Sequence, residues 1–265
     1  MCEVRWVDKS LTLGDGIQLE SRIWMPSGKG PWPALLMRQP YGRQIASTVT
    51  YAHPSWWASK GYMVIIQDVR GMGSSGGVFN GFSQEASDTS ETHKWVRSLK
   101  ECNGKLGLYG FSYQGFTQLV GEPNSEPPDC LSPAMTGINI KDHWCSDGEA
   151  FWWHNNIAWG LQIAALKMKR KNNFFEWKKI RVALENKNYL REGLDILKKY
   201  DPNSFILVWL NNLNNSIPFE EIKPISTWIQ KPMLIIGGLW DPHLKGAFDL
   251  YKKSKEAGGS PEIII

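Results

Sequence analysis

The stretch that decides the fold is Gly107-Leu108-Tyr109-Gly110-Phe111-Ser112-Tyr113-Gln114-Gly115. Its first half is typical of a short apolar strand, and a helix is expected to start near Phe116. A sharp strand-to-helix turn lifts a serine hydroxyl clear of the sheet, and small neighbours keep such a turn free of clashes. The helix then points backbone N–H groups at charge that develops during acyl transfer. The pattern predicts that Ser112 is a nucleophile, although an ordinary turn without a catalytic role can have the same sequence.

One position departs from the usual G-x-S-x-G elbow. The second glycine falls three residues after Ser112, at Gly115, and Gln114 stands where that glycine is normally found. Taken alone, the motif is therefore only moderately specific.

Around this turn the chain alternates between strand-like and helical patterns. The run at 62–67 is continuously apolar, as expected for a strand buried on both faces. Gly14-Asp15-Gly16 is a strong hairpin signal between two further strand-like runs. Expected strands are 4–13, 17–25, 33–38, 62–67, 105–109, 232–237 and one from 262, and expected helices are 55–60, 87–98 and 246–257. The alternation predicts an α/β fold with a mainly parallel sheet covered on both faces.

The pattern changes at about residue 142. Strand-like runs disappear, and helical periodicity covers 150–169, 173–184 and 189–199. This predicts a helical insertion and three regions: a first part of the core at 1–141, a helical cap at 142–224 and a second part of the core at 225–265.

Four blocks, the elbow motif among them, occur in a fixed order along the chain: R-x-P-Y-x-R at 38–43, Q-D-V-R-G-x-G-x-S-x-G at 67–77, G-x-S-Y-x-G at 110–115 and G-G-x-W-D at 237–241. Together they closely resemble the cocaine esterase (CocE/NonD) and X-Pro dipeptidyl-peptidase (S15) family of serine hydrolases. The resemblance covers nearly the whole chain and is weakest between about 174 and 222. It implies an α/β-hydrolase fold with an inserted cap, and it makes the spacing around Gln114 normal.

Acyl transfer by a serine also needs an oriented base and donors for the oxyanion. Asp241 follows an apolar strand, at the edge where α/β sheets build sites. Asp241 is a candidate for the acid that orients the base. A role as a helix cap explains its Asp-Pro dipeptide equally well, until the matching G-G-x-W-D block is considered, which favours the catalytic role. The backbone N–H of Tyr113 is one expected oxyanion donor. The resemblance implies the Tyr41 hydroxyl as the second, the alternative being an ordinary half-buried aromatic.

Three charged residues in these blocks are interpreted as structural. A buried Asp-Arg pair beneath the site would fix two loops without a catalytic role. The residues concerned are Arg38, Asp68 and Arg70.

The catalytic base is the missing part. His243 is too close in sequence to Asp241 for the usual geometry. The other histidines precede Asp241 and are interpreted as structural or substrate-facing: His53, His93, His143 and His154. The resemblance places the base in a loop after the strand that begins near 261. It therefore implies a chain that ends before its catalytic histidine and before the family's β-sandwich domain.

Two functions stay open. The first is a serine hydrolase that cleaves an ester or amide, with a small-molecule ester or short peptide as substrate. The second is a non-catalytic remnant that folds and binds acyl ligands. Tryptophans at 144, 152, 153 and 159 form a cap core or a wall for an apolar substrate group, and Trp144, Trp152 and Trp153 are the candidate contacts. Glu149, with Asp142 and Asp147, is a candidate for the free amine of an X-Pro substrate, and helix capping explains these acids equally well.

Composition further limits the classes of function and partner that are expected for this chain. The net charge of +4 is small, and the basic run at 167–171 is best interpreted as a helix C-terminus, so nucleic acid is not expected as a partner. No apolar run approaches membrane-spanning length, and no signal peptide is seen. The cysteines (Cys2, Cys102, Cys130 and Cys145) show no metal-ligand spacing, which indicates reduced thiols in a cytoplasmic protein. Neither a metal nor a cofactor is expected, and the oligomeric state stays open.

Overall fold

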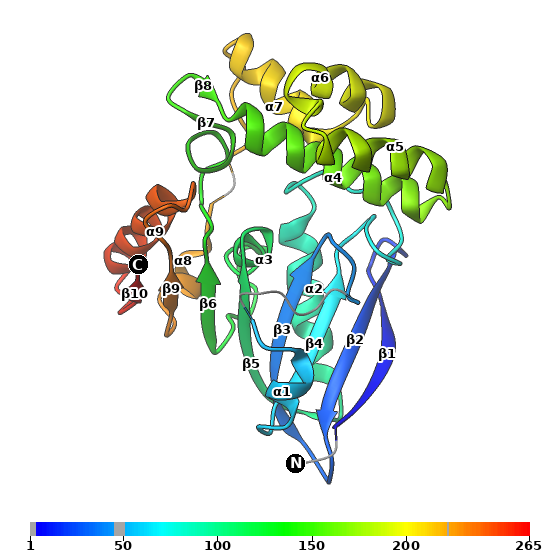
Figure 1. Ribbon diagram of the computed structural model, residues 1–265. Helices are drawn as coiled ribbons and strands as arrows, with labels where there is room; N and C mark the ends of the chain where they lie inside the picture. The colour runs from blue at the N-terminus through cyan, green and yellow to red at the C-terminus, as the bar shows by residue number, and fades with distance from the viewer. Residues whose placement is uncertain (1–3, 45–50, 222) are drawn as a thin grey trace. The chain divides into compact units, whose positions relative to one another are not determined.

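The computed structural model describes residues 4–44, 51–221 and 223–265 (Figure 1). These residues form two compact units. The first unit consists of Met1–Phe79, Gln84–Ile138 and Ile222–Ile265, and it contains an eight-stranded sheet. The second, the helical unit, consists of Asn80–Ser83 and Asn139–Glu221.

The sheet has the order β1-β2-β4-β3-β5-β6-β9-β10. Its first two pairings, β1 with β2 and β2 with β4, are antiparallel, and every other pairing is parallel. The mainly parallel sheet predicted from sequence is thereby confirmed. The strands are β1 Val4–Thr12, β2 Gln18–Pro26, β3 Trp32–Gln39, β4 Met63–Asp68, β5 Cys102–Phe111, β6 Cys130–Ala134, β9 Leu234–Ile236 and β10 Glu262–Ile264.

Apolar side chains on one face of the sheet form the main core. Leu36, Ile65 and Leu108 on the central strands are at most 4% exposed. Helices α2 (Glu85–Ser98) and α9 (Leu244–Glu256) contribute Val96 and Leu250 to the same core. The six residues of β4 are all buried, which explains why its sequence is apolar without alternation.

Among the described residues, those packed on the opposite face of the sheet cover part of its width. Helix α1 (Pro54–Ala58) packs there through Ala58, against residues of β2, β3, β4 and β5. Further along, this face carries a cavity of about 420 Å³, named here the sheet-face cavity. It is lined by Leu35, Tyr51, Trp57, Leu108, Tyr109, Cys130, Leu131, Ser132, Pro232, Met233, Leu234, Ser260 and Glu262. Within the described residues, the Tyr109 hydroxyl and the Trp57 indole N–H have no hydrogen-bond partner.

The helical unit contains four longer helices and one small hairpin. The helices are α4 Trp153–Arg170, α5 Phe174–Glu185, α6 Tyr189–Tyr200 and α7 Phe205–Asn214, and a π-helical turn (η1) covers Lys141–Cys145. Two differences from the sequence expectation stand out. Residues 150 and 151, expected to be helical, instead form strand β8, which pairs with β7 (Ser146–Asp147) across a turn at Gly148 with φ of 59°. Helix α7 was not expected, because its first half is apolar on every side and shows no period.

Two short helices, α3 (Tyr113–Phe116) and α8 (Ser226–Ile229), complete the first unit. Among the described residues, no helix has both the length and the apolar character needed to cross a membrane.

Candidate active site

Ser112 occupies a strained turn between β5 and α3. Its backbone has φ of 55° and ψ of −125°, a region that non-glycine residues adopt only where the surroundings enforce it. The Ser112 N–H donates to the carbonyl of Ala134 at 2.9 Å, and the Ser112 carbonyl accepts from the Gly115 and Phe116 N–H groups at 2.8 and 3.0 Å. These bonds hold the turn between β6 and the first turn of the helix, which is the geometry of a nucleophile elbow.

Gly115 explains the position of the second glycine in the motif. A Cβ at this position would lie 2.8 Å from the Cβ of Thr136 and 3.0 Å from the carbonyl oxygen of Ala134. The helix therefore packs directly on the backbone that follows β6. Glycine is needed where the helix touches that backbone, and the position normally occupied by glycine is free to carry Gln114.

The side chain of Tyr113 anchors the elbow from below. It is fully buried, and its hydroxyl donates to Glu85 Oε1 at 2.8 Å. The other oxygen of Glu85 accepts from Arg38 Nη1 at 2.7 Å. Burial raises the pKa of Glu85, against the opposing effects of Arg38 and the Tyr113 hydroxyl. Burial also raises the pKa of Tyr113, and Glu85 and the Tyr41 phenol act in the same direction.

The charged residues of the motif blocks have partners that differ from the simple pair expected. Asp68 pairs with Arg43, through Nη1 at 2.8 Å and through the Arg43 backbone N–H. Burial raises the pKa of Asp68 in spite of this pairing. Arg38 pairs with Glu85 instead, so the arginine partner of Asp68 is neither Arg38 nor Arg70.

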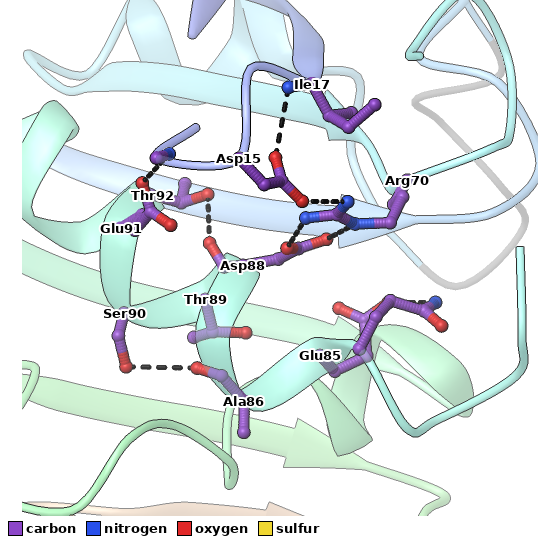
Figure 2. Close-up of polar contacts among 12 residues, drawn as sticks. Asp15, Ile17, Arg70, Glu85, Ala86, Asp88, Thr89, Ser90, Glu91 and Thr92 are labelled. Carbon is purple, nitrogen blue, oxygen red and sulfur yellow. Dashed lines mark hydrogen bonds and ion pairs between the residues drawn. The ribbon is translucent and has the colours of Figure 1, made fainter. Parts of the chain in front are cut away.

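Arg70 forms a separate clamp. Figure 2 shows its guanidinium between two carboxylates, with bonds of 3.0 and 2.6 Å to Asp88 on α2 and of 2.5 Å to Asp15 in the first hairpin. Asp88 is fully buried. The clamp joins three segments that are distant in sequence, in agreement with a structural role for Arg70.

The strand order brings three predicted residues to one edge of the sheet. Tyr41 lies two residues after β3, Ser112 follows β5 directly, and Asp241 lies five residues after β9. These strands are parallel, and only β6 stands between β5 and β9, through the pairs Phe111 with Ala134 and Ala134 with Ile236. Two strand spacings amount to about 10 Å. The ends of β5 and β9, after which Ser112 and Asp241 follow, are therefore about 10 Å apart.

The two carboxylate oxygens of Asp241 differ in their hydrogen bonding. The side chain is 8% exposed, and Oδ1 accepts from the His243 backbone N–H at 2.9 Å. Oδ2 is buried and has no hydrogen-bond partner among the described residues. His243, not Asp241, is the N-cap residue of α9. Asp241 thus organises the turn before the helix and still has an oxygen available for another donor.

Two histidines of the first unit have environments of their own. The His53 ring caps α1 through Ser55, with Nδ1 2.8 Å from the Ser55 hydroxyl. His93 lies on α2, is 2% exposed and stacks on Trp228 with ring centroids 4.9 Å apart. Burial lowers the pKa of His93 to about 3, and Arg38 and Arg97 act in the same direction. His53 therefore helps to begin α1, and His93 packs in the interior of the first unit.

The helical unit holds the other two early histidines and the predicted substrate contacts. His143 Nδ1 accepts from the Asn139 N–H at 3.1 Å, and His154 Nδ1 lies 2.7 Å from the Tyr189 hydroxyl. Trp144 is 3% exposed and packs against Phe82 with centroids 5.0 Å apart, so most of its ring contributes to the core of this unit.

The remaining predicted contacts lie near the start of α4. Trp152 and Trp153 are half-buried, and the Trp153 indole donates to the Leu190 carbonyl at 3.2 Å. Glu149 is exposed in the β7–β8 turn.

A cavity of about 290 Å³ lies within the helical unit. Its lining combines aromatic rings with amides and one carboxylate: Asn80, Phe82, Ser83, Ile140, Asn203, Phe205, Val208, Trp209, Asn212, Phe219 and Glu220. The Ser83 hydroxyl donates to Glu220 Oε2 at 2.7 Å. None of the four predicted substrate contacts lines this cavity. The sequence signal that could have identified this cavity is the set of asparagines within and beside the apolar run at 205–214.

Within the described ranges, no group of three or more His, Cys, Asp or Glu side chains is arranged to hold a metal ion.

Comparison with known proteins agrees with the fold. A family model described as X-Pro dipeptidyl-peptidase (S15 family) matches residues 15–265. The cocaine esterase of Rhodococcus sp. (strain MB1 Bresler) is 34% identical over 153 residues, which make up 56% of this chain and 27% of the esterase.

Two solved structures extend the similarity over almost the whole chain. A CocE/NonD family hydrolase from Staphylococcus aureus matches with a TM-score of 0.71 and 17% identity, covering 99% of this chain and 49% of its own. An aminopeptidase from the marine sediment archaeon Thaumarchaeota archaeon matches with a TM-score of 0.59 and 20% identity, covering 95% and 46%. The chain therefore spans about half the length of these structures, and at such identities they establish the fold alone.

The resemblance seen in the motif blocks is confirmed by the family match, and the α/β-hydrolase fold by the sheet and its structural relatives. The chain belongs to the X-Pro dipeptidyl-peptidase (S15) family of hydrolases.

Proposed function

We propose that this protein is a serine hydrolase that cleaves an ester or amide through an acyl-enzyme on Ser112. The observation that carries the proposal is the pairing of two unusual features at one sheet edge. Ser112 is held at a positive φ on an elbow, and Asp241 keeps a buried oxygen without a partner. Strain and an unsatisfied buried carboxylate both destabilise the folded state, and both are common where a site serves chemistry.

The residues have distinct roles in the proposed reaction. The Ser112 hydroxyl attacks the substrate carbonyl carbon while an imidazole takes its proton. The backbone N–H of Tyr113 and the hydroxyl of Tyr41 donate to the oxyanion that forms. The imidazolium then gives the proton to the departing alcohol or amine, and water releases the acyl group by the same steps. Asp241 orients the imidazole by accepting its second N–H at Oδ2.

Two substrate classes agree with the similarities reported above, one to a cocaine esterase and the other to a family described as X-Pro dipeptidyl-peptidase. We propose a small ester or a short peptide as the substrate. Trp144, Trp152, Trp153 and Glu149 stay predictions as substrate contacts, and the mostly buried position of Trp144 leaves it the least ring surface to offer.

A second candidate function is a protein that binds acyl ligands without turnover. One observation favours it: in the part of the chain that the structure describes, Asp241 Oδ2 accepts no hydrogen bond from an imidazole. Loss of one triad member removes several orders of magnitude from the rate and leaves only the contribution of the oxyanion hole and binding. The 265-residue chain is therefore expected to turn over esters very slowly.

Labelling by a fluorophosphonate, with and without added imidazole, separates these possibilities. We expect slow labelling of the 265-residue chain, loss of labelling in Ser112→Ala, and normal labelling in Ser132→Ala, a half-buried serine on β6. Free imidazole should accelerate labelling by occupying the place beside Asp241 Oδ2, and Asp241→Asn should lose this acceleration. Absence of labelling under every condition would contradict the hydrolase proposal. Fast labelling without imidazole would show that one of the described histidines acts as the base.

A further inference from the structure

Gln114 is the residue that stands in the unusual position of the elbow motif, and its side chain turns back across the elbow. It is 2% exposed. Its Oε1 accepts from the backbone N–H of Phe111 at 3.2 Å, and its Nε2 donates to Gln39 Oε1 at 2.8 Å. The amide therefore joins the end of β5 to the end of β3.

Gln39 continues this connection into the loop that carries Tyr41. Gln39 is 1% exposed, and its Nε2 donates to the carbonyl of Gly42 at 3.0 Å. Three hydrogen bonds thus lead from the residue before Ser112 to the residue after Tyr41. Both ends are backbone groups, so the bridge fixes the course of the chain and not only the side chains.

The surroundings of the bridge leave it little freedom. Gly110 has φ of 140°, and a Cβ there would lie 2.4 Å from the Gln114 Cβ, so the glycine makes room for this side chain. In the same peptide unit as the Gly42 carbonyl, the Arg43 N–H donates to Asp68. The peptide unit that follows Tyr41 and Gly42 is therefore held through both of its polar groups, the N–H by Asp68 and the carbonyl by Gln39, which Gln114 holds in turn.

We propose that Gln114 is a positioning residue that fixes the Tyr41 hydroxyl relative to Ser112 through the Gln114–Gln39–Gly42 bridge. This inference rests on the proposed function, in which Tyr41 donates to the oxyanion. A serine and a donor on two different loops need a fixed separation, because a displacement of about 1 Å costs about 100-fold in rate. The bridge supplies that separation from a buried position and makes no contact with the substrate.

The expected effect of breaking the bridge follows from this role. Removing one oxyanion donor typically lowers the rate by about 100- to 1000-fold. Gln114→Leu misplaces the donor without removing it, so we expect Ser112 labelling by a fluorophosphonate to slow by about 10- to 100-fold. In a Tyr41→Phe background the same change should have almost no further effect, because the donor that it misplaces is already absent.

Gln118→Leu is the matched control. Gln118 is also a buried glutamine on the segment after Ser112, and its Nε2 donates to the carbonyls of Gly110, Gln114 and Ser132 at 3.1 to 3.3 Å. It ties β5 to β6 and makes no bond to the Tyr41 loop. We expect it to reduce stability to urea about as much as Gln114→Leu and to change the labelling rate less than about 3-fold.

Two measurements on the 265-residue chain test the proposal. The first is the labelling rate in Gln114→Leu, Tyr41→Phe, the double variant and Gln118→Leu. The second is amide hydrogen exchange in a peptide covering 37–44, which should accelerate at least about 10-fold in Gln114→Leu and not in Gln118→Leu. Gln114→Glu keeps the acceptor for the Phe111 N–H and loses the donor to Gln39, so we expect the same effects from it as from Gln114→Leu. It takes the place of the leucine variant in both measurements if that variant fails to fold.

The outcomes separate this proposal from the function on which it rests. An undiminished effect of Gln114→Leu in the Tyr41→Phe background, or an equal effect of Gln118→Leu, would overturn the positioning role. Unchanged exchange at 37–44 would overturn the bridge itself. If Ser112 takes no label in any form of the protein, the hydrolase proposal fails, while the exchange measurement still decides whether the bridge holds the loop.

Discussion

Replacing His93 by phenylalanine should remove part of the protein's sensitivity to mild acid. His93 is buried on α2 against Trp228, and neither ring nitrogen has a hydrogen-bond partner among the described residues. Burial lowers its pKa from 6.5 to about 3. The folded protein therefore keeps this ring neutral at pH 5, whereas the unfolded chain takes up a proton.

The sign of the effect follows from linkage. Because the pKa is lower in the folded state, the contribution to stability is complete above about pH 6.5 and is lost as the pH falls toward 3. Between pH 7 and pH 5 the unfolded chain gains most of one proton, which lowers the free energy of unfolding by about 2 kcal/mol. The result hardly depends on the folded pKa, provided that it stays below about 4.

The assay is urea unfolding followed by circular dichroism at pH 7 and pH 5, for the wild type and for His93→Phe. Phenylalanine keeps a ring against Trp228 and cannot titrate. We expect the loss of stability between the two pH values to be about 2 kcal/mol smaller in the variant, since all other titrating groups are shared. If both proteins lose the same free energy, His93 is accessible to protons in the folded state and the argument is wrong.

Three further predictions follow from other contacts. Gly115→Ala should destabilise the protein by about 1–3 kcal/mol, measured by urea unfolding, because the new methyl group meets the Thr136 side chain; wild-type stability would show that the elbow can shift. Arg70→Met should cost about 3–5 kcal/mol in the same assay, because it leaves the buried carboxylate of Asp88 without its partner; a change below about 1 kcal/mol would exclude the clamp. Among the described cysteines, Cys130 is exposed and the other two are buried, so iodoacetamide should modify Cys130 first, as judged by peptide mass spectrometry; earlier modification of a buried thiol would contradict the packing.

The sequence predicted the parts of the fold that local pattern controls. The local sequences of the hairpin turn at 14–16, the buried strand β4 and the elbow are each compatible with only a few backbone conformations. A last strand was expected from residue 262, which is where β10 begins. Strand β6 was not expected, because its five residues include Pro133 and it pairs with β9 through few residues.

The site was predictable where a motif fixes both residue and position. Ser112 and Asp241 each follow a strand, so their arrival at one sheet edge follows from parallel pairing. The polar network beneath them was not predictable. Nothing in the local sequence distinguishes Glu85 and Gln39 from other polar residues. Their roles arise from hydrogen bonds to Tyr113 and Gln114, which lie 28 and 75 residues away in the chain. Arg43 was likewise overlooked as the partner of Asp68, since three arginines in the same blocks compete for that role.

The sheet-face cavity has a practical consequence for anyone who measures the melting of this protein. As formed by the described residues, its walls are mainly apolar, it opens on the surface, and at about 420 Å³ it is large enough for an aromatic dye. Dyes that brighten on contact with apolar surface would bind the native protein before any heating. The baseline of a dye-based melting curve would then start high and fall as the cavity is lost, which can hide the transition. Intrinsic fluorescence or calorimetry reports the unfolding of this chain without that interference.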